Sequence, residues 1–237
     1  MRIQRALARA GVTSRRDAER LVAEGRVRVN GAVAVIGQDV GPEDALEVDG
    51  RLVAEEEPRT YLLYKPLGAV STVRDPQGRP TVLEGMPEDV RLYPVGRLDK
   101  DTTGALLVTN DGELASRLMH PRSKVPKVYE ALVDGRVSAA TIRRLRNGVE
   151  LEDGPTLPAT VERMERVHPG GTWLRLELTE GRNRQVRRMA AAVGHPVLRL
   201  HRSRYAGVGL ARMRPGAWRP LSQAELERLA ALVGLER

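Results

Sequence analysis

A short apolar run between two polar loops is the feature that most limits how this chain can fold. Residues 105–108 read Ala-Leu-Leu-Val, and polar residues dominate 94–104 on one side and 109–112 on the other. An apolar run bounded by turn residues is typical of a buried strand, and the loops beside such strands often carry functional sites. Four charged side chains lie close together in the first loop: Arg97, Asp99, Lys100 and Asp101. By spacing alone they fit either a functional site or a solvated surface turn.

The remaining patterns predict a mixture of strands and helices. Apolar or alternating runs indicate strands at 61–64, 125–133, 157–165 and 172–179, and helical spacing indicates helices at 112–119, 184–193 and 224–233. These elements do not alternate regularly, as they would in a doubly wound parallel sheet. The sequence therefore predicts an α+β fold.

The beginning of the chain predicts a small domain of its own. Apolar residues at helical spacing indicate a helix over 3–10, and Ser14 is a suitable N-cap for a second helix that ends at Glu24. Asn-Gly at 30–31 predicts a tight hairpin. The acidic, proline-bearing segment 55–59 then has the composition of a linker. We therefore predict two domains, residues 1–57 and residues 58–237.

Composition excludes several classes of chemistry. The chain has no cysteine, which excludes disulfides, thiolate catalysis and zinc sites built on cysteine, and which suits a reducing cytoplasm. The histidines at 120, 168, 195 and 201 have no metal-ligand spacing, and the chain has no phosphate-binding loop or dinucleotide fingerprint. It also has no apolar leader at its start and no apolar run long enough to cross a bilayer. We expect a soluble cytoplasmic protein that does not contact a membrane.

The charge distribution favours a nucleic-acid partner. The net charge is +8 and the pI about 10.4. Residues 1–30 contain eight Arg and three acidic residues, a net charge of +5, whereas 31–60 contain two Arg and eight acidic residues, a net charge of −6. Lysine occurs only at 65, 100, 124 and 127, so arginine supplies nearly all the positive charge. Arginine suits RNA because it binds phosphate and stacks on bases, although GC-rich coding or heat adaptation produces the same bias.

Two strings in the N-terminal segment resemble the S4 RNA-binding domain. They are Ser-Arg-Arg-Asp-Ala-Glu at 14–19 and Gly-Arg-Val-Arg-Val-Asn-Gly at 25–31. In that domain two helices and the following turn present basic side chains to structured RNA. The resemblance implies RNA contacts by Arg2, Arg5, Arg9, Arg15, Arg16 and Arg28. The alternative is a solvated basic helix face.

The charged loop and the strand after it resemble the signature of the ribosomal small-subunit-A-like pseudouridine synthases. The matching strings are Gly-Arg-Leu-Asp at 96–99, Thr-Gly at 103–104 and Thr-Asn-Asp-Gly at 109–112. In that family the aspartate of the first string is the catalytic nucleophile, which implies this role for Asp99. Spacing alone leaves Lys100 and Asp101 open as alternatives.

Two later motifs continue this resemblance. Lys-Val-Tyr-Glu at 127–130 implies that Tyr129 stacks on the target base and removes a proton, although a lone tyrosine also fits a core position. Glu-Gly-Arg-Asn-Arg-Gln-Val-Arg-Arg-Met at 180–189 resembles the motif whose arginine pairs with the catalytic carboxylate. By register we expect that arginine to be Arg187. The last motif also implies RNA contacts by Arg182, Asn183 and Arg184. Because the target nucleotide must leave the stacked RNA, we further expect Arg97, next but one to Asp99, to fill the vacated space.

The resemblance also implies a substrate and an architecture. The strings at 75–82 and 180–184 are more similar to the B-type synthases of the large ribosomal subunit, which implies a uridine of 23S ribosomal RNA. A 16S substrate and a non-catalytic ribosome-assembly factor are the alternatives. We expect an S4 domain followed by a mixed, mainly antiparallel sheet with flanking helices and a central cleft. The implied reaction isomerises uridine to pseudouridine without net oxidation, so we expect no cofactor and no metal. We also expect a monomer whose partner is ribosomal RNA, free or within a pre-ribosomal particle.

Overall fold

The fold is that of a computed structural model, which describes residues 1–236. The chain divides into two compact units. The first contains Met1–Arg59, Gly85–Tyr93 and Thr109–Gly112, and the second contains the remaining segments. No helix among residues 1–236 has the length and apolar character needed to span a membrane.

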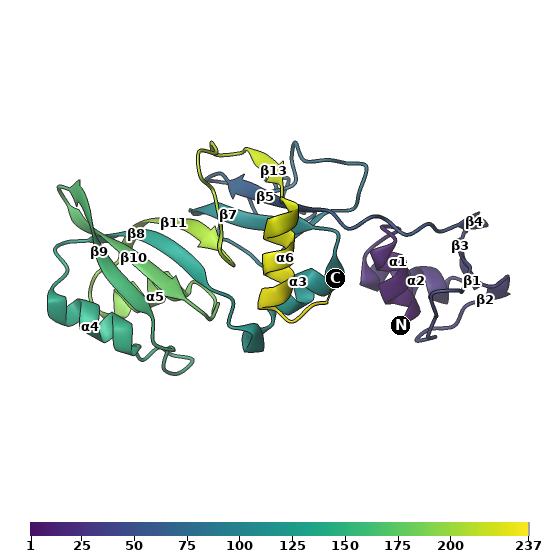
Figure 1. Cartoon of the computed structure of the whole chain (residues 1–237), viewed down its shortest axis with the longest axis horizontal. Helices are drawn as coiled ribbons and strands as arrows, with labels where there is room; N and C mark the ends of the chain where they lie inside the picture. Colours follow the sequence, from purple (N-terminus) through teal and green to yellow (C-terminus); the bar gives the residue numbers. More distant parts are fainter. Residues whose placement is uncertain (237) are drawn as a thin grey trace. The chain divides into compact units, whose positions relative to one another are not determined.

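The first unit packs two helices against a small antiparallel sheet of strand order β2-β1-β3-β4 (Figure 1). The elements are α1 (Ile3–Arg9), α2 (Arg15–Ala23), β1 (Val27–Val29), β2 (Ala32–Val33), β3 (Leu46–Val48) and β4 (Arg51–Leu52). The Ser14 hydroxyl accepts the N–H of Asp17 at the start of α2, as expected for an N-cap. Asn30 and Gly31 have φ values of 52° and 82° in the predicted hairpin turn. Both predicted helices and the hairpin are therefore present.

The second unit is built on a nine-stranded sheet, whose main path has the order β13-β5-β7-β11-β8-β10-β9. Its strands are β5 (Thr60–Lys65), β6 (Tyr93–Pro94), β7 (Thr102–Thr109), β8 (Lys127–Asp134), β9 (Thr160–His168), β10 (Gly171–Leu178), β11 (Val197–Tyr205), β12 (Val208–Gly209) and β13 (Trp218–Pro220). Strands β7 and β11 are parallel, whereas β8 pairs antiparallel with β10 and β11, β9 with β10, and β5 with β13. The sheet is therefore mixed and mainly antiparallel, as predicted.

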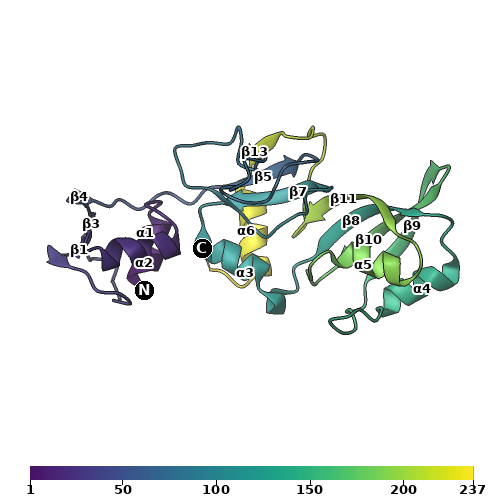
Figure 2. The same ribbon diagram turned by 180° about the vertical axis from the view of Figure 1, so that it is seen from behind.

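The helices of this unit are amphipathic elements that cover the sheet. They are α3 (Gly112–Met119), the 3-10 helix η1 (Pro121–Ser123), α4 (Ala139–Asn147), α5 (Gln185–Ala192) and α6 (Gln223–Leu232). Figures 1 and 2 show α4 and α5 on one side of β8, β9 and β10. Val186 and Met189 of α5 and Leu145 of α4 pack there with apolar strand residues such as Leu176. This cluster fixes the position of α5, whose N-terminus carries the basic motif.

The sequence patterns missed α4 and did not assign β11. Ser138 caps α4 by accepting the N–H of Thr141, the same kind of signal that Ser14 gave for α2. Strand β11 lies between β7 and β8 and comes so close to β7 that Gly104 cannot carry a side chain. A Cβ at Gly104 would lie 2.2 Å from the carbonyl oxygen of Arg202, and Gly104 has φ 123°. The absence of a side chain at Gly104 thus permits the parallel pairing of β7 with β11, directly after the charged loop.

Candidate active site

The charged loop before β7, residues 95–101, is held through its backbone by the segment that follows β5. The Ser71 hydroxyl donates to the carbonyl oxygen of Leu98 at 2.8 Å and accepts the Leu98 N–H at 3.1 Å. Gly68 N–H donates to the carbonyl oxygen of Lys100 at 2.9 Å. Lys65 Nζ reaches the carbonyl oxygens of Thr102 at 2.8 Å and Lys100 at 3.5 Å. The main-chain groups of residues 98, 100 and 102 are therefore hydrogen-bonded to Lys65, Gly68 and Ser71.

Lys65 is a buried cation underneath this loop. Its side chain is fully buried at the end of β5, and it also donates to the carbonyl oxygen of Pro66 at 3.1 Å. Burial lowers the pKa of Lys65 to about 8, and the negative charges of Asp101 and Asp99 oppose that shift. The sequence patterns ended the predicted strand at residue 64 and gave Lys65 no role. The available signal was a lysine that directly continues an apolar strand before a proline.

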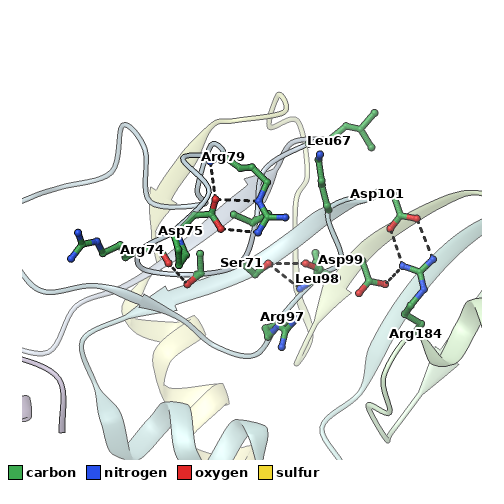
Figure 3. A pocket seen from close by; sticks show the side chains of 15 residues that line it. Leu67, Ser71, Arg74, Asp75, Arg79, Arg97, Leu98, Asp99, Asp101 and Arg184 are labelled. Atoms are coloured by element: carbon green, nitrogen blue, oxygen red, sulfur yellow. Dashed lines mark hydrogen bonds and ion pairs between the residues drawn. The ribbon is translucent and has the colours of Figure 1, made fainter. Parts of the chain in front are cut away.

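The intervening side chains, Asp99 and Asp101, meet arginines from the N-terminal end of α5. Arg184 Nη1 lies 3.4 Å from Asp99 Oδ2, and Arg184 Nη2 lies 3.4 Å from Asp101 Oδ2. Arg187 Nη2 lies 3.1 Å from Asp101 Oδ2 and donates to the Asp101 carbonyl oxygen at 2.9 Å. Figure 3 shows the Arg184 guanidinium between the two carboxylates. The result is a chain of alternating charges that joins the loop to the helix.

The expected pairing of Asp99 with Arg187 is not the one that forms. Arg184 takes that place, and Arg187 contacts Asp101 instead. Both arginines contact the Asp101 carboxylate, although only Arg187 has a helical backbone. Arg184 precedes the first helical residue and has a left-handed backbone with φ 47°, a costly conformation for a residue with a Cβ. Motif register could not resolve which arginine pairs with Asp99.

The residues predicted to contact RNA in the motif at 180–189 differ in their exposure and in their protein contacts. Asn183 and Arg184 are exposed. The Arg182 guanidinium is engaged by protein oxygens: it donates to the carbonyl oxygens of Gly154 at 2.8 Å and Pro155 at 2.5 Å, and it pairs with Glu180 at 3.3 Å. Arg182 therefore fits a structural role better than the expected RNA contact.

A cavity of about 890 Å³ opens beside Asp99 (Figure 3). Five basic and three acidic residues are among those that line it: Arg74, Arg79, Arg97, Lys100 and Arg184, with Asp75, Asp99 and Asp101. Its volume lies in the range of ligand-binding pockets. The Asp99 side chain is 29% exposed, so its carboxylate is held by the protein and open to a ligand. Among residues 1–236, no group of three or more His, Asp and Glu side chains could hold a metal ion.

The far wall of the cavity is a loop with its own internal ion pair. Arg79 Nη2 lies 2.7 Å from Asp75 Oδ1, and the Arg79 N–H donates to Asp75 Oδ2 at 2.8 Å. The hydrogen bonds from Arg79 lower the pKa of Asp75 to about 2. Asp75 therefore remains a carboxylate at physiological pH, and the charged pair with Arg79 persists.

Tyr129 lies on β8 and is not among the described residues that line the cavity. It pairs with Leu176 of β10 and Arg202 of β11, is half-buried, and packs against the apolar cluster that includes α5. It therefore faces the side of the sheet covered by the helix that carries Arg184. Tyr129 thus has the contacts of a core aromatic residue. It also packs against the cluster that contains Val186 and Met189 of the basic motif at 180–189.

The six arginines predicted to bind RNA in the first unit are all exposed: Arg2, Arg5, Arg9, Arg15, Arg16 and Arg28. Arg2 pairs with Asp39 at 3.3 Å and Arg9 with Glu55 at 3.4 Å, both as solvated surface pairs. Such pairs contribute little to stability and are readily exchanged for phosphate.

The sequence and the fold were compared with those of known proteins. A family model for RNA pseudouridylate synthases matches residues 59–192, and a model for the S4 domain matches residues 1–46. An uncharacterized RNA pseudouridine synthase of Aquifex aeolicus is 46% identical over 242 residues, which cover 100% of this chain and 96% of the relative. Ribosomal large subunit pseudouridine synthase B of Bacillus subtilis is 45% identical over 98% of this chain and 96% of its own length. A crystal structure of a pseudouridylate synthase matches with TM-score 0.69 and 30% identity, covering 97% of this chain and 99% of that chain. The chain therefore belongs to the RNA pseudouridine synthase family and carries an N-terminal S4 domain, and the predicted family and fold class are confirmed.

Proposed function

We propose that this protein converts a uridine of 23S ribosomal RNA to pseudouridine, with Asp99 as the nucleophile. The observation that carries the proposal is the Asp99 carboxylate, ion-paired with Arg184 at 3.4 Å and open to a basic cavity. Relatives from Bacillus subtilis and Pseudomonas aeruginosa, each 45% identical, are named for the ribosomal large subunit. Those names support 23S over 16S RNA as the substrate.

The reaction needs an ionised carboxylate next to the sugar. The N1–C1′ bond breaks with its electron pair leaving on the uracil, while an Asp99 oxygen bonds to C1′. The base then turns, C5 bonds to C1′, Asp99 is released, and the C5 proton leaves to a base. In the alternative path Asp99 takes the C2′ proton, which leaves a glycal, and returns that proton when C5 bonds to C1′. Nothing is oxidised or reduced overall. Asp99 fits because its neighbours on both sides are held through the backbone, so its side chain is aimed by the fold.

The target atom is hidden within stacked RNA, so the nucleotide must leave the stack. We assign Arg97, exposed at the cavity next but one to Asp99, to the space that the nucleotide vacates. Tyr129 is assigned to stack on the flipped base and to accept the C5 proton. An Arg97→Ala variant that flips the nucleotide as well as the unmodified protein does would contradict the first assignment.

The first domain, residues 1–57, is proposed to hold the RNA while residues 58–237 carry out the chemistry. Its six exposed arginines provide the phosphate contacts. We propose that a monomer acts in the cytoplasm, on ribosomal RNA that is free or within a pre-ribosomal particle.

Release of tritium from C5 of labelled uridine tests the substrate and the reaction together, because only rejoining through C5 displaces that hydrogen. Unmodified 16S and 23S transcripts are incubated separately with the protein. We expect release from 23S RNA and none from 16S RNA. Release from 16S RNA alone contradicts the substrate, and release from neither RNA nor from pre-ribosomal particles contradicts the activity.

A further inference from the structure

Asp101 is the point at which the two arginines at the start of α5 meet. Arg184 approaches both of its carboxylate oxygens, with Nη1 3.4 Å from Oδ1 and Nη2 3.4 Å from Oδ2. Arg187 contacts Oδ2 at 3.1 Å and the main-chain oxygen at 2.9 Å. Asp99 has a single contact with Arg184, also at 3.4 Å. Of the two carboxylates, Asp101 therefore has the more extensive contacts with the helix.

Arg184 needs an external restraint to remain beside Asp99. It precedes the helix, its backbone is left-handed, and its side chain is 45% exposed. A single partly exposed ion pair is too weak to fix a long flexible side chain. Two parallel contacts with one carboxylate, by contrast, fix the plane of a guanidinium.

The Asp101 carboxylate is itself fixed from a second direction. Arg187 is largely buried, with a side chain only 14% exposed, and it belongs to the first turn of α5, which is packed into the core. The main chain on either side of Asp101 is held by Gly68 and Lys65 through Lys100 and Thr102. Because Asp101 is fixed in this way, it can restrain the Arg184 side chain that contacts it.

We infer that Asp101 is a positioning residue that holds Arg184 against Asp99. The inference rests on the proposed function, because it assumes that Asp99 reacts. It also explains how Arg184 stays in place during the reaction. The charge of Asp99 is consumed when its oxygen bonds to C1′, whereas the charge of Asp101 is not, so Arg184 keeps an anionic partner throughout.

A double-mutant cycle tests whether Asp101 acts through Arg184. The variants are Asp101→Asn, Arg184→Met and their combination, measured by single-turnover tritium release with enzyme in excess over 23S RNA. We expect Asp101→Asn to slow the reaction about 10-fold, with RNA affinity within threefold of the unmodified protein. In the Arg184→Met background, the same substitution should change the rate less than twofold.

Asp153→Asn is the matched control. Asp153 is 50% exposed, like Asp101, and it pairs with Arg188 of the same helix at 2.8 Å. Its loss should leave the rate within twofold, which shows that removing a surface carboxylate beside α5 is not in itself harmful. Asp101→Glu keeps the charge and should react faster than Asp101→Asn. If the asparagine variant does not fold, the glutamate variant completes the same cycle.

The outcomes separate the inference from the proposed function. An Asp101→Asn rate within twofold of the unmodified protein, or effects that multiply with those of Arg184→Met, overturn the positioning role. A loss confined to RNA affinity overturns it as well, because Asp101 would then be an RNA contact. If the unmodified protein itself releases no tritium, the proposed function fails first, and this inference fails with it.

Discussion

At the residue scale, the Ser71 hydroxyl holds the backbone on the N-terminal side of Asp99. Ser71 satisfies both the N–H and the carbonyl oxygen of Leu98, at 3.1 and 2.8 Å, and the Leu98 residue is only 6% exposed. Without the hydroxyl, two poorly hydrated polar groups beside Asp99 lose their partner. The loop is then expected to shift and to move Asp99 with it. Small displacements of a reacting group slow catalysis strongly.

We therefore expect Ser71→Ala to lower kcat about 10-fold while the KM for RNA changes less than threefold. Steady-state kinetics on 23S RNA measure both constants. Ser71→Thr restores the hydroxyl and should recover most of the rate. Ser123→Ala is the control and should react normally; it removes the 2.7 Å hydrogen bond that the Ser123 hydroxyl in η1 donates to the carbonyl oxygen of Arg117 in α3. An unchanged kcat in Ser71→Ala would show that the Leu98 contacts do not matter for catalysis.

Lys65 makes stability depend on pH in a defined direction. Burial lowers the pKa of Lys65 to about 8 in the folded protein, from 10.5 in the unfolded chain. Between these values the unfolded chain binds more protons, so the free energy of unfolding rises with pH in this window. Well below pH 8 both states are protonated and the burial penalty is constant.

The Lys65→Met variant isolates this contribution. From pH 7.5 to pH 9.5, the unfolding free energy of the unmodified protein should rise by about 1 to 2 kcal/mol relative to that of the variant. Urea titrations at the two pH values measure this difference, and other titrating groups cancel because both proteins share them. A difference that stays constant or falls would contradict a depressed pKa for Lys65.

At the scale of elements, the N-terminus of α5 combines the contact with Asp99 with backbone strain. Arg184 has φ 47°, which glycine adopts without penalty and other L-residues adopt at a cost of about 1 to 2 kcal/mol. Observed strain of this kind often marks a functional residue. Residue 184 therefore combines a guanidinium that pairs with Asp99 and Asp101 with a strained backbone.

Arg184→Gly and Arg184→Ala separate these two properties. Both remove the contacts with Asp99 and Asp101, so both should lose activity equally. The glycine variant should be more stable than the alanine variant by about 1 kcal/mol, because only alanine retains the Cβ that disfavours this conformation. Urea unfolding curves at one pH decide the point, and an alanine variant as stable as the glycine variant would rule out strain at this residue.

The elements themselves were largely predictable, whereas the pairing between them was not. Local signals located α2, α6 and the hairpin, since the cap Ser14, the helical spacing over 224–233 and the Asn-Gly turn act within a few residues. Strand β11 was not assigned because its alternating basic residues do not form a clear apolar pattern. The partner of Asp99 depends on the backbone conformation of one residue, and the Ser71–Leu98 contact joins positions 27 residues apart. Neither is encoded in local periodicity.

At the scale of the whole molecule, the acidic segment before β5 is fastened more firmly than its composition indicated. In the first unit, Asn110 accepts the Arg59 N–H at 2.6 Å and donates to the carbonyl oxygen of Glu57 at 2.9 Å. Thr109 donates to the carbonyl oxygen of Arg59 at 2.7 Å. Residues 57–59 therefore have ordered partners in the Thr-Asn-Asp-Gly string, which a linker composition did not predict.

This contact predicts that the position of a truncation matters. A shortened chain that begins at residue 54 retains the Asn110 contacts, whereas one that begins at residue 60 loses them. The longer chain should be more stable by about 1 to 3 kcal/mol in urea unfolding, because several partly buried hydrogen bonds are kept. Equal stability of the two chains would mean that water replaces these bonds without loss.

Both shortened chains lack the eight arginines of residues 1–30. The KM for 23S RNA should therefore rise at least about tenfold, and RNA affinity should fall less steeply with salt, because fewer phosphate contacts release fewer counterions. The rate at saturating RNA should remain within threefold. A large loss of that rate would place part of the catalytic machinery in the first domain.

The central claim is that Asp99 is the nucleophile, and Asp99→Asn tests it most directly. This substitution keeps the shape of the side chain and removes its charge. Single-turnover release of tritium from 23S RNA is compared for the unmodified protein, Asp99→Asn, Asp101→Asn and the control Asp153→Asn, each checked for folding by its melting temperature. We predict a loss of roughly 10³-fold or more in Asp99→Asn alone. A folded Asp99→Asn variant that reacts within tenfold of the unmodified protein, with the large loss appearing in Asp101→Asn instead, would contradict the account and assign the nucleophile to Asp101.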